Sequence, residues 1–257
     1  MSDGRITIKT EAQMELMRAA GELVGKTLKM LEGMVKVGIS TKELDEAAEE
    51  FIRSHGGIPS FLNYDGFPAS ICTSVNEQVV HGIPSKKVRL KDGDIISIDC
   101  GAIVEGFHGD AARTFLVGNV APEVQKLVEV TKECFFKGFE QAQPGNHIRD
   151  IAKAVEAHAE AHGYGVVREL VGHGIGTSMH EAPEVPNFTD IRMGRGAKLE
   201  PGMAIAVEPM INLGSRRIKL LADGWTCATL DGKPSAHYEN TIFITKTGPE
   251  ILTNPIE

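Results

Sequence analysis

One pattern of segments occurs twice along this chain, and no other feature limits its fold as strongly. In each half, two segments with apolar residues at helical spacing precede a long stretch of apolar runs and turn residues that is typical of strands. The segments 38–56 and 145–163 match in register, because each begins with glycine and ends with His-Gly after the same spacing. Since such repetition produces similar units that pack on each other, we expect two halves related by a pseudo-twofold axis. Chance similarity between two such segments is the alternative.

The positions of the predicted elements follow from apolar periodicity and from turn residues. Thr10 and Gln13 predict a capping box at the start of the first helix. Glycines or a Pro-Gly pair follow the expected helix ends. We expect helices over 11–34, 41–55, 122–141 and 148–162, and strands within 60–117 and 165–252.

Length, charge and composition limit the class of protein. No linker or low-complexity segment divides the 257 residues, so we expect one domain, 1–257, with halves at about 11–118 and 121–252. A net charge of −8 gives no reason to expect nonspecific nucleic-acid binding or an anionic membrane surface. Four scattered cysteines without CxxC spacing, no signal sequence and no membrane-spanning apolar run predict a soluble protein of the cytoplasm.

Four carboxylates occupy matching positions of the two halves. When the repeats are aligned, Asp99 falls on Glu208, and Asp110 falls on Glu239. Asp99 and Glu208 each end a run of apolar residues, and a carboxylate at the end of a buried strand is costly unless a cation compensates it. These acids are therefore candidate metal ligands, and solvated loop acids are the alternative.

Asp99 and Asp110 are predicted to converge on one site. They are separated by a Gly-rich connection containing Gly101, Gly106 and Gly109, which we interpret as the bend of a hairpin. On adjacent strands of a hairpin, side chains on the same face lie together. The spacing therefore lets both carboxylates point into one site.

His173 supplies the imidazole of this candidate site. It lies in a Gly-rich segment, 172–176, in which the backbone can bend and leave the ring room to reach a metal. Four carboxylates and one imidazole suit a pair of divalent ions in a hydrolase, and the absence of HExxH excludes a helical zinc-peptidase site. We interpret the remaining histidines outside the motifs as structural or surface residues: His55, His108, His147, His158, His162 and His237.

These motifs together carry a specific resemblance. Over nearly its whole length the chain resembles the type I methionine aminopeptidases of the M24 family, whose pita-bread fold is of the α+β class, with a central curved antiparallel sheet covered by helices. The matching segments are 76–84 (NEQVVHGIP), 98–101 (IDCG), 109–114 (GDAART), 172–176 (GHGIG), 180–183 (HEAP), 208–209 (EP) and 238–241 (YENT).

The resemblance implies a dinuclear-metal aminopeptidase that removes the initiator methionine of nascent chains when the second residue is small. A metal-bridging water or hydroxide would attack the first peptide bond. Glu208 would also move the proton, and His81 and His180 would contact the scissile amide, with His180 stabilising the oxyanion. Two ions of Co, Mn, Fe or Zn are implied, and their ligands would be Asp99, Asp110, His173, Glu208 and Glu239.

The resemblance also implies a pocket for the methionine side chain, formed by Tyr64, Phe67, Cys72, Met179 and Trp225. This chain departs from the family pattern at two places, because Met179 stands where well-known bacterial members carry Phe, and Phe61 stands where some carry Cys. A polarizable methionine should preserve an apolar pocket, although of altered shape. A monovalent cation, Na or K, is implied near Asn76, Gln78 and Ser235.

Several alternatives remain at this stage. An aminopeptidase cleaving before proline, or a creatinase-like enzyme, would share the fold but carry a large extra N-terminal domain, and a type II enzyme would carry a helical insertion between His180 and Glu208. An inactive pita-bread module that binds peptides is an alternative from another class, but such a module would be expected to lose ligands. As partners we expect peptides with N-terminal methionine and a transient contact with the ribosome, and we expect a monomer that binds neither a specific nucleic acid nor a membrane.

Overall fold

The computed structural model describes residues 4–254, and its helices agree with those expected from the sequence. The described chain forms four long helices, whose ends lie within one residue of the predicted ends. The predicted capping box is present, since the Thr10 side chain accepts from the Gln13 N–H and the Gln13 side chain accepts from the Thr10 N–H. The helices are α1 (Glu11–Met34), α2 (Thr41–Ser54), α3 (Pro122–Gln141) and α4 (Ile148–Ala161).

Two antiparallel sheets dominate the strand layer. The first has the order β1-β4-β2 with β5 on the other edge of β4, and the second has the order β15-β14-β9-β7-β8. The first sheet contains β1 (Ile58–Pro59), β2 (Ile71–Val75), β4 (Ile95–Val104) and β5 (Phe107–Leu116). The second contains β7 (Gly172–Gly174), β8 (Glu181–Val185), β9 (Ala204–Val207), β14 (Asn240–Ile244) and β15 (Pro249–Ile251).

Two smaller sheets connect parts that are far apart in the sequence. One has the order β13-β10-β6, and the other, β11-β12-β3, pairs a strand of the first half with strands of the second. Their strands are β3 (Gln78–Val80), β6 (Gly165–Val166), β10 (Met210–Asn212), β11 (Ile218–Leu220), β12 (Cys227–Thr229) and β13 (Ser235–His237). Short 3₁₀ turns occur at Tyr64–Gly66 and Ile191–Met193.

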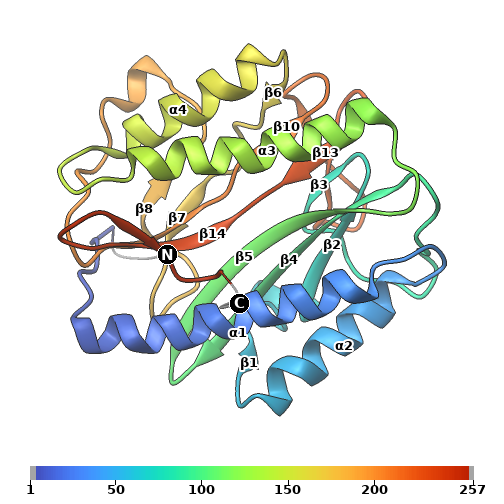
Figure 1. Cartoon of the computed structure of the whole chain (residues 1–257), viewed down its shortest axis with the longest axis horizontal. Helices are drawn as coiled ribbons and strands as arrows, with labels where there is room; N and C mark the ends of the chain where they lie inside the picture. Colours follow the sequence, from blue (N-terminus) through green and yellow to red (C-terminus); the bar gives the residue numbers. More distant parts are fainter. Residues whose placement is uncertain (1–3, 255–257) are drawn as a thin grey trace.

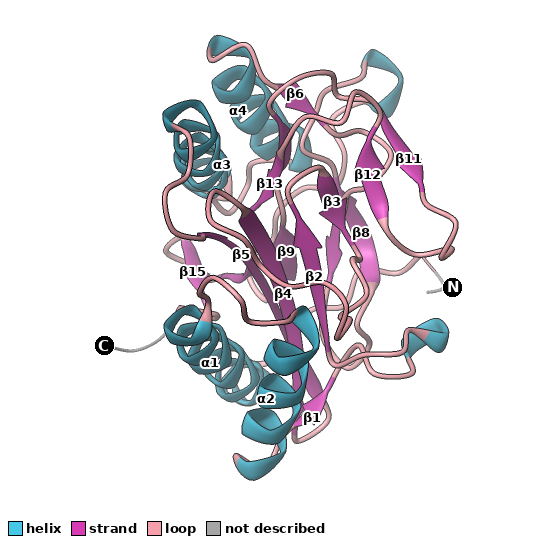
Figure 2. Ribbon diagram, turned by 90° about the vertical axis from the view of Figure 1, so that its right-hand side faces the viewer, coloured by secondary structure: helices cyan, strands magenta, loops and turns pink. Residues whose placement is uncertain are grey.

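The helices lie in two pairs over one face of the strands, α1 with α2 and α3 with α4 (Figure 1; Figure 2). Each pair packs on its own core: residues such as Leu31 and Leu44 pack with Ile98 in the first half, and Phe135 and Ile151 belong to the core of the second. α4 begins and ends 107 residues after α2, and α3 ends 107 residues after α1 although it is shorter, so the lengths of chain between the helices of each pair are equal. None of the helices in the described part of the chain is long and apolar enough to cross a membrane.

A line of hydrogen bonds joins the two halves along β5. The N–H groups of Ala112 and Glu239 donate to each other's carbonyl oxygens, at 3.3 Å and 3.0 Å. The Thr241 hydroxyl donates to the Asp110 carbonyl at 2.9 Å and accepts from the Asp110 N–H at 3.0 Å. The Arg113 guanidinium donates to the Glu239 carbonyl. Two predicted metal ligands, Asp110 and Glu239, are therefore fixed by backbone bonds at this seam.

The interpretation of a Gly-rich bend between Asp99 and Asp110 is wrong for two of its three glycines. The turn between β4 and β5 is formed by Glu105 and Gly106, with φ of 48° and 82°, while Gly101 and Gly109 lie inside the strands. A Cβ at Gly109 would lie 2.7 Å from the Gly21 nitrogen of α1, and one at Gly101 would lie 2.8 Å from the Ser60 Cβ. These glycines permit close packing on the strands, a tertiary requirement that sequence periodicity does not reveal.

Replacement of Gly109 by alanine should destabilise the protein. The added Cβ would meet the backbone of α1, which has to shift, at a cost of about 1–3 kcal/mol in the free energy of unfolding measured in urea. Gly33→Ala, also a glycine replacement, is the control: apart from its chain neighbours and the backbone of its own helix, no described atom lies within 4 Å of its Cβ, and alanine favours a helix by about 1 kcal/mol. Equal stabilities of the two variants would contradict the close-packing account.

Candidate metal centre

Asp99 and Asp110 lie on the same face of the hairpin formed by β4 and β5. In its register Asp99 faces Ala112 and Asp110 faces Gly101, so the two carboxylates are diagonal neighbours rather than direct partners. Burial raises the pKa of both carboxyl groups above the ordinary value, and at Asp110 the neighbouring Asp99 adds to this rise. The structure thus brings these two predicted ligands together as expected.

Glu208 and Glu239 come from the second sheet and lie just past the end of a strand pair. β9 ends at Val207 and β14 begins at Asn240, and these two residues are partners in the ladder. Continuing that antiparallel register by one step places Glu208 and Glu239 opposite each other. The two acids of this half are therefore direct neighbours, in contrast to the diagonal pair of the first half.

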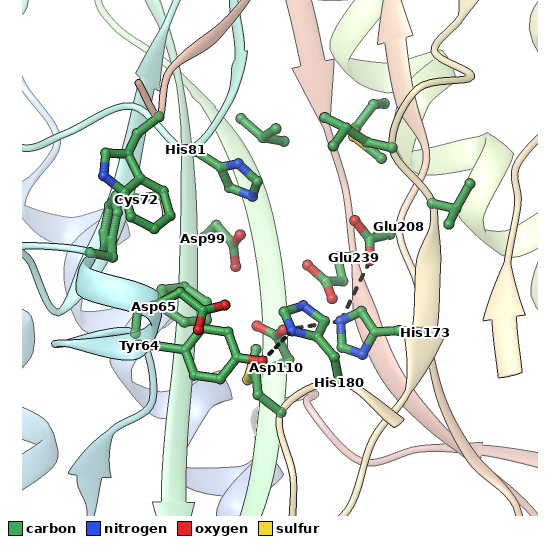
Figure 3. Close-up of a pocket in the computed structure, with 18 residues that line it drawn as sticks. Tyr64, Asp65, Cys72, His81, Asp99, Asp110, His173, His180, Glu208 and Glu239 are labelled. Carbon is green, nitrogen blue, oxygen red and sulfur yellow. Dashed lines mark hydrogen bonds and ion pairs between the residues drawn. The ribbon is translucent and has the colours of Figure 1, made fainter. Parts of the chain in front are cut away.

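His173 faces the acids from β7 with its tautomer fixed. Its Nδ1 lies 2.9 Å from the Gly174 carbonyl oxygen, which can only accept, so Nδ1 carries the proton and the Nε2 lone pair is available. Nε2 lies 3.7 Å from both Asp110 Oδ2 and Glu208 Oε1 (Figure 3). Burial lowers the pKa of His173 to about 3, so this ring is a neutral donor at neutral pH.

Burial of the acids makes this site costly without a cation. Burial raises the pKa of Asp99 to about 7. Burial first, and neighbouring carboxylates second, raise the pKa values of Asp110, Glu208 and Glu239 well above their ordinary range. Among the described residues, Asp99 Oδ1, Asp110 Oδ1 and Glu239 Oε1 are buried without a hydrogen-bond partner. Such groups need either protons or positive ions.

The donor set fits divalent ions. Ligand atoms of Asp110, His173 and Glu239 lie within 4.8 Å of one another, and those of Asp99, His237 and Glu239 form a second such group. Carboxylate oxygens and a neutral imidazole are ligands that divalent transition metals accept. Since Glu239 belongs to both groups, the arrangement fits two ions that share a carboxylate. The five predicted ligands are together, and their ligand role stays a prediction.

His237 is a residue of this region that the sequence analysis placed among the structural or surface histidines. It is fully buried, its Nε2 lies 3.7 Å from Glu239 Oε2, and neither ring nitrogen has a hydrogen-bond partner within residues 4–254. Burial lowers its pKa to about 3. A signal was present in the sequence, because residues two apart on an extended segment point to the same side, and His237 precedes Glu239 by two.

The four acids line a cavity of about 270 Å³. All the residues predicted to form the methionine pocket line the same cavity. Its apolar part is a cluster in which the rings of Phe67 and Trp225 meet edge to face with centroids 5.2 Å apart. Phe61 and Met179, the two departures from the family pattern, are buried in the same cluster. Lining residues that the sequence analysis did not select are Asp65, Val80, Leu170, Val171 and Met210.

His81 and His180 also line the cavity. The Tyr64 hydroxyl lies 2.8 Å from His180 Nδ1, and the ring of His180 meets that of His173 with centroids 4.2 Å apart (Figure 3). Burial lowers the pKa of both His81 and His180 below the ordinary value. Both rings are therefore neutral at neutral pH, and a neutral imidazole can donate one hydrogen bond and accept another.

Two of the residues predicted to lie near a monovalent cation, Asn76 and Gln78, use their side chains in hydrogen bonds within the chain. The Asn76 amide donates to Asp94 Oδ1 at 2.8 Å, and Gln78 Oε1 accepts from the Val75 N–H at 2.9 Å. The Ser235 N–H donates to the Asn76 carbonyl at 2.9 Å, so these two segments are adjacent. A cation there would have to use backbone oxygens, and this site stays a prediction.

Comparison with known proteins gives the family of the chain. The model of metallopeptidase family M24 matches residues 15–246. The methionine aminopeptidase of Clostridium perfringens is 56% identical over 248 residues, covering 96% of this chain and 98% of the relative. The crystal structure of methionine aminopeptidase from Rickettsia prowazekii has a TM-score of 0.94 at 45% identity, covering 97% of this chain and all of that one.

A more distant structure shares only the fold. An Xaa-Pro dipeptidase from Bacillus anthracis has a TM-score of 0.77 at 24% identity, and the match covers 62% of its length. The expected pita-bread architecture, of the α+β class, is confirmed by these neighbours. The chain belongs to metallopeptidase family M24.

Proposed function

We propose that this protein is a methionine aminopeptidase that uses two divalent ions to remove the initiator methionine from peptides and nascent chains whose second residue is small. One observation carries the proposal: a buried cluster of four carboxylates and a neutral imidazole opens into an apolar cavity. Relatives at 56% identity over nearly the full length are named methionine aminopeptidase, which supports the same activity here.

The chain's residues divide into those that hold the ions and those that handle the peptide. Asp99, Asp110, His173, Glu208 and Glu239 would hold two ions of Co, Mn, Fe or Zn. The ions would activate water for attack on the first peptide bond and stabilise the charge that develops. Glu208, at the edge of the cluster with its carboxylate facing the cavity, would take a proton and pass it to the leaving amine.

The imidazoles above the cluster would orient the scissile amide. His180 is held through Nδ1 by the Tyr64 hydroxyl, so its Nε2 would face the carbonyl oxygen of the substrate and stabilise the developing negative charge. His81 lines the same cavity and would contact the amide from the other side. Two neutral rings permit donation without adding charge that would repel the ions.

The apolar part of the cavity would hold the methionine side chain. Tyr64, Phe67, Cys72, Met179 and Trp225 form one cluster with little polar surface, and burial keeps the Cys72 thiol protonated by raising its pKa well above the ordinary value. A thioether is polarizable and makes favourable contacts with aromatic edges, which the Phe67 and Trp225 rings supply.

Further properties belong to the same proposal. Residues 1–257 would form one catalytic domain with halves at about 11–118 and 121–252, and residues 1–3 and 255–257 of that range lie outside the described residues. A monovalent cation, Na or K, would bind near Asn76, Gln78 and Ser235. The protein would act as a monomer in the cytoplasm, contact the ribosome transiently, and bind neither a specific nucleic acid nor a membrane.

The proposal is tested by peptide cleavage. Purified protein is freed of metal, supplied with Mn²⁺ or Co²⁺, and assayed on Met-Ala-Ser and on peptides beginning Xaa-Pro. Release of methionine that depends on added metal supports the proposal. Preferential cleavage of Xaa-Pro, or no cleavage of either peptide with both ion sites filled, would overturn it.

Asp110→Asn should weaken metal binding and yet stabilise the metal-free protein. Loss of one ligand charge should lower ion affinity and kcat by ~100-fold or more, measured by metal analysis after dialysis and by peptide cleavage. Without metal, removal of a buried acid whose ionisation is opposed by burial and by neighbouring carboxylates should raise the free energy of unfolding by about 1 kcal/mol. Asp190→Asn, at a partly exposed aspartate that pairs with Arg192 and does not line the cavity, is the matched control and should change neither metal content nor activity.

In the metal-free protein, the stability contribution of Asp99 should fall as pH rises from about 4 to about 7. Asp99 has a folded pKa of about 7, above its ordinary 3.8, so its contribution is fully present below about 3.8 and is lost as pH rises to about 7. His173 and His237, with folded pKa values of about 3, act in the opposite direction only below their unfolded pKa of about 6.5.

Urea unfolding across this pH range, with chelator and with Mn²⁺, measures the effect. Between pH 6.5 and 7, where the histidines no longer oppose Asp99, we expect the stability of the chelated protein to fall as pH rises, with a slope of up to about −1 kcal/mol per pH unit from this acid. Bound ions favour the ionised carboxylates, so the slope should largely disappear with Mn²⁺. A chelated protein whose stability does not fall between pH 6.5 and 7 would show that Asp99 is not protonated in the fold at this pH.

A further inference from the structure

A second group of metal-ligand side chains lies outside the cavity, between α3 and α4. Glu133 on α3, His158 on α4 and His162 at the C-cap of α4 place their ligand atoms within 4.8 Å of one another. These helices lie alongside each other over the strands (Figure 1), and none of the three residues lines the cavity. The proposed peptidase activity makes no use of these side chains.

The two imidazoles are placed on one side of the helix end. Residues four apart on a helix lie one above the other. His162 Nδ1 lies 2.9 Å from the His158 carbonyl oxygen, so Nδ1 carries the proton and the Nε2 lone pair is available. A ligating histidine commonly makes this kind of bond through its other nitrogen.

Glu133 completes the donor set from the neighbouring helix. Its Oε2 lies 2.7 Å from His158 Nε2, and this hydrogen bond is the main reason that the pKa of Glu133 lies below its ordinary value. The carboxylate is therefore ionised at neutral pH. Insertion of an ion would separate these two atoms to about 3.3 Å, the spacing of ligands at tetrahedral bond lengths of about 2.0–2.1 Å. Both side chains are partly exposed, so they have room for this shift.

The equivalent position in the first half, at the end of α2, has the same hydrogen bond from a histidine to a carbonyl oxygen but different side chains in place of the ligands. At an offset of 107 residues, Lys26, Phe51 and His55 correspond to Glu133, His158 and His162. His55 Nδ1 likewise lies 2.8 Å from the Phe51 carbonyl oxygen, and its ring stacks on that of Phe51 at 4.1 Å. An ammonium and a phenyl ring cannot bind a cation as ligands. The potential site is therefore particular to the second half and is not a by-product of how these helices end.

We propose that Glu133, His158 and His162 form a site for a third divalent transition-metal ion, which joins α3 to α4. Two imidazoles and one carboxylate suit Zn²⁺, Ni²⁺ or Cu²⁺ and are poor ligands for Mg²⁺ or Ca²⁺. Water would complete the coordination, because the group is at the surface. The site is independent of the two ions of the cavity, whose ligands all come from the strand side of the molecule.

The test counts Zn²⁺ ions at equilibrium. Wild-type protein, His162→Ala and His158→Gln are dialysed against a series of Zn²⁺ concentrations, and bound metal is measured by elemental analysis. We expect both variants to bind one Zn²⁺ fewer than wild type, or to bind it at least tenfold more weakly, while His55→Ala binds as wild type does. Cleavage of Met-Ala-Ser by both His162→Ala and His55→Ala should equal that of wild type.

A second readout locates the ion. Addition of Zn²⁺ should shift the ring signals of His158 and His162 in NMR spectra of the metal-loaded protein and leave those of His55 unchanged. Identical Zn²⁺ stoichiometry and affinity in wild type and both variants, or unshifted His158 and His162 signals at millimolar Zn²⁺, would overturn the proposal. The peptidase proposal is tested separately by peptide cleavage, so its failure would leave the results on Zn²⁺ binding unchanged.

Discussion

The mutual repulsion of four buried carboxylates is the constraint on which the rest of this structure depends. Asp99, Asp110, Glu208 and Glu239 meet at the wall of the cavity, where Asp110 and Glu239 are buried and Asp99 and Glu208 are partly buried, and desolvation raises the pKa of each. Two like charges about 4 Å apart repel each other by several kcal/mol near the surface or in the interior of a protein. The fold must therefore hold them by other means until protons or metal ions neutralise them.

The duplicated architecture provides those means. Each half contributes two acids from its own sheet, and each sheet is supported by its own pair of helices and its own core. The seam along β5 then fixes the acids of opposite halves relative to one another through backbone bonds of Asp110 and Glu239. Hydrogen bonds that use main-chain atoms leave the carboxylates themselves available as ligands, and this is why the ligand geometry can be rigid while the charges stay uncompensated.

Much of this arrangement could be predicted from sequence because its signals are local. Helix ends follow from residues such as Thr10 and Gln13, whose capping bonds form within one turn. The positions of Asp99 and Glu208 follow from acids that end short apolar runs, although Asp99 lies inside β4 and only Glu208 directly follows the end of its strand. The internal repeat aligns the acids of one half with those of the other, and it therefore predicts that both halves contribute to one site.

The features that could not be predicted depend on contacts distant in sequence. Gly109 is required by the backbone of α1, and no periodic pattern reports such an approach. The pairing of β3 with β12 joins the two halves across about 150 residues of chain. His237 is different, because its position two residues before Glu239 is a local signal for a place beside the metal centre, although a single histidine is usually structural.

Calorimetric titration of the metal-free protein with Mn²⁺ at pH 7, in buffers of different ionisation enthalpy, tests the central claim most directly. If the buried acids hold protons that cations replace, two Mn²⁺ ions should bind in the cavity with net release of protons. Binding of two ions without proton release, or no binding at millimolar Mn²⁺, would contradict the account.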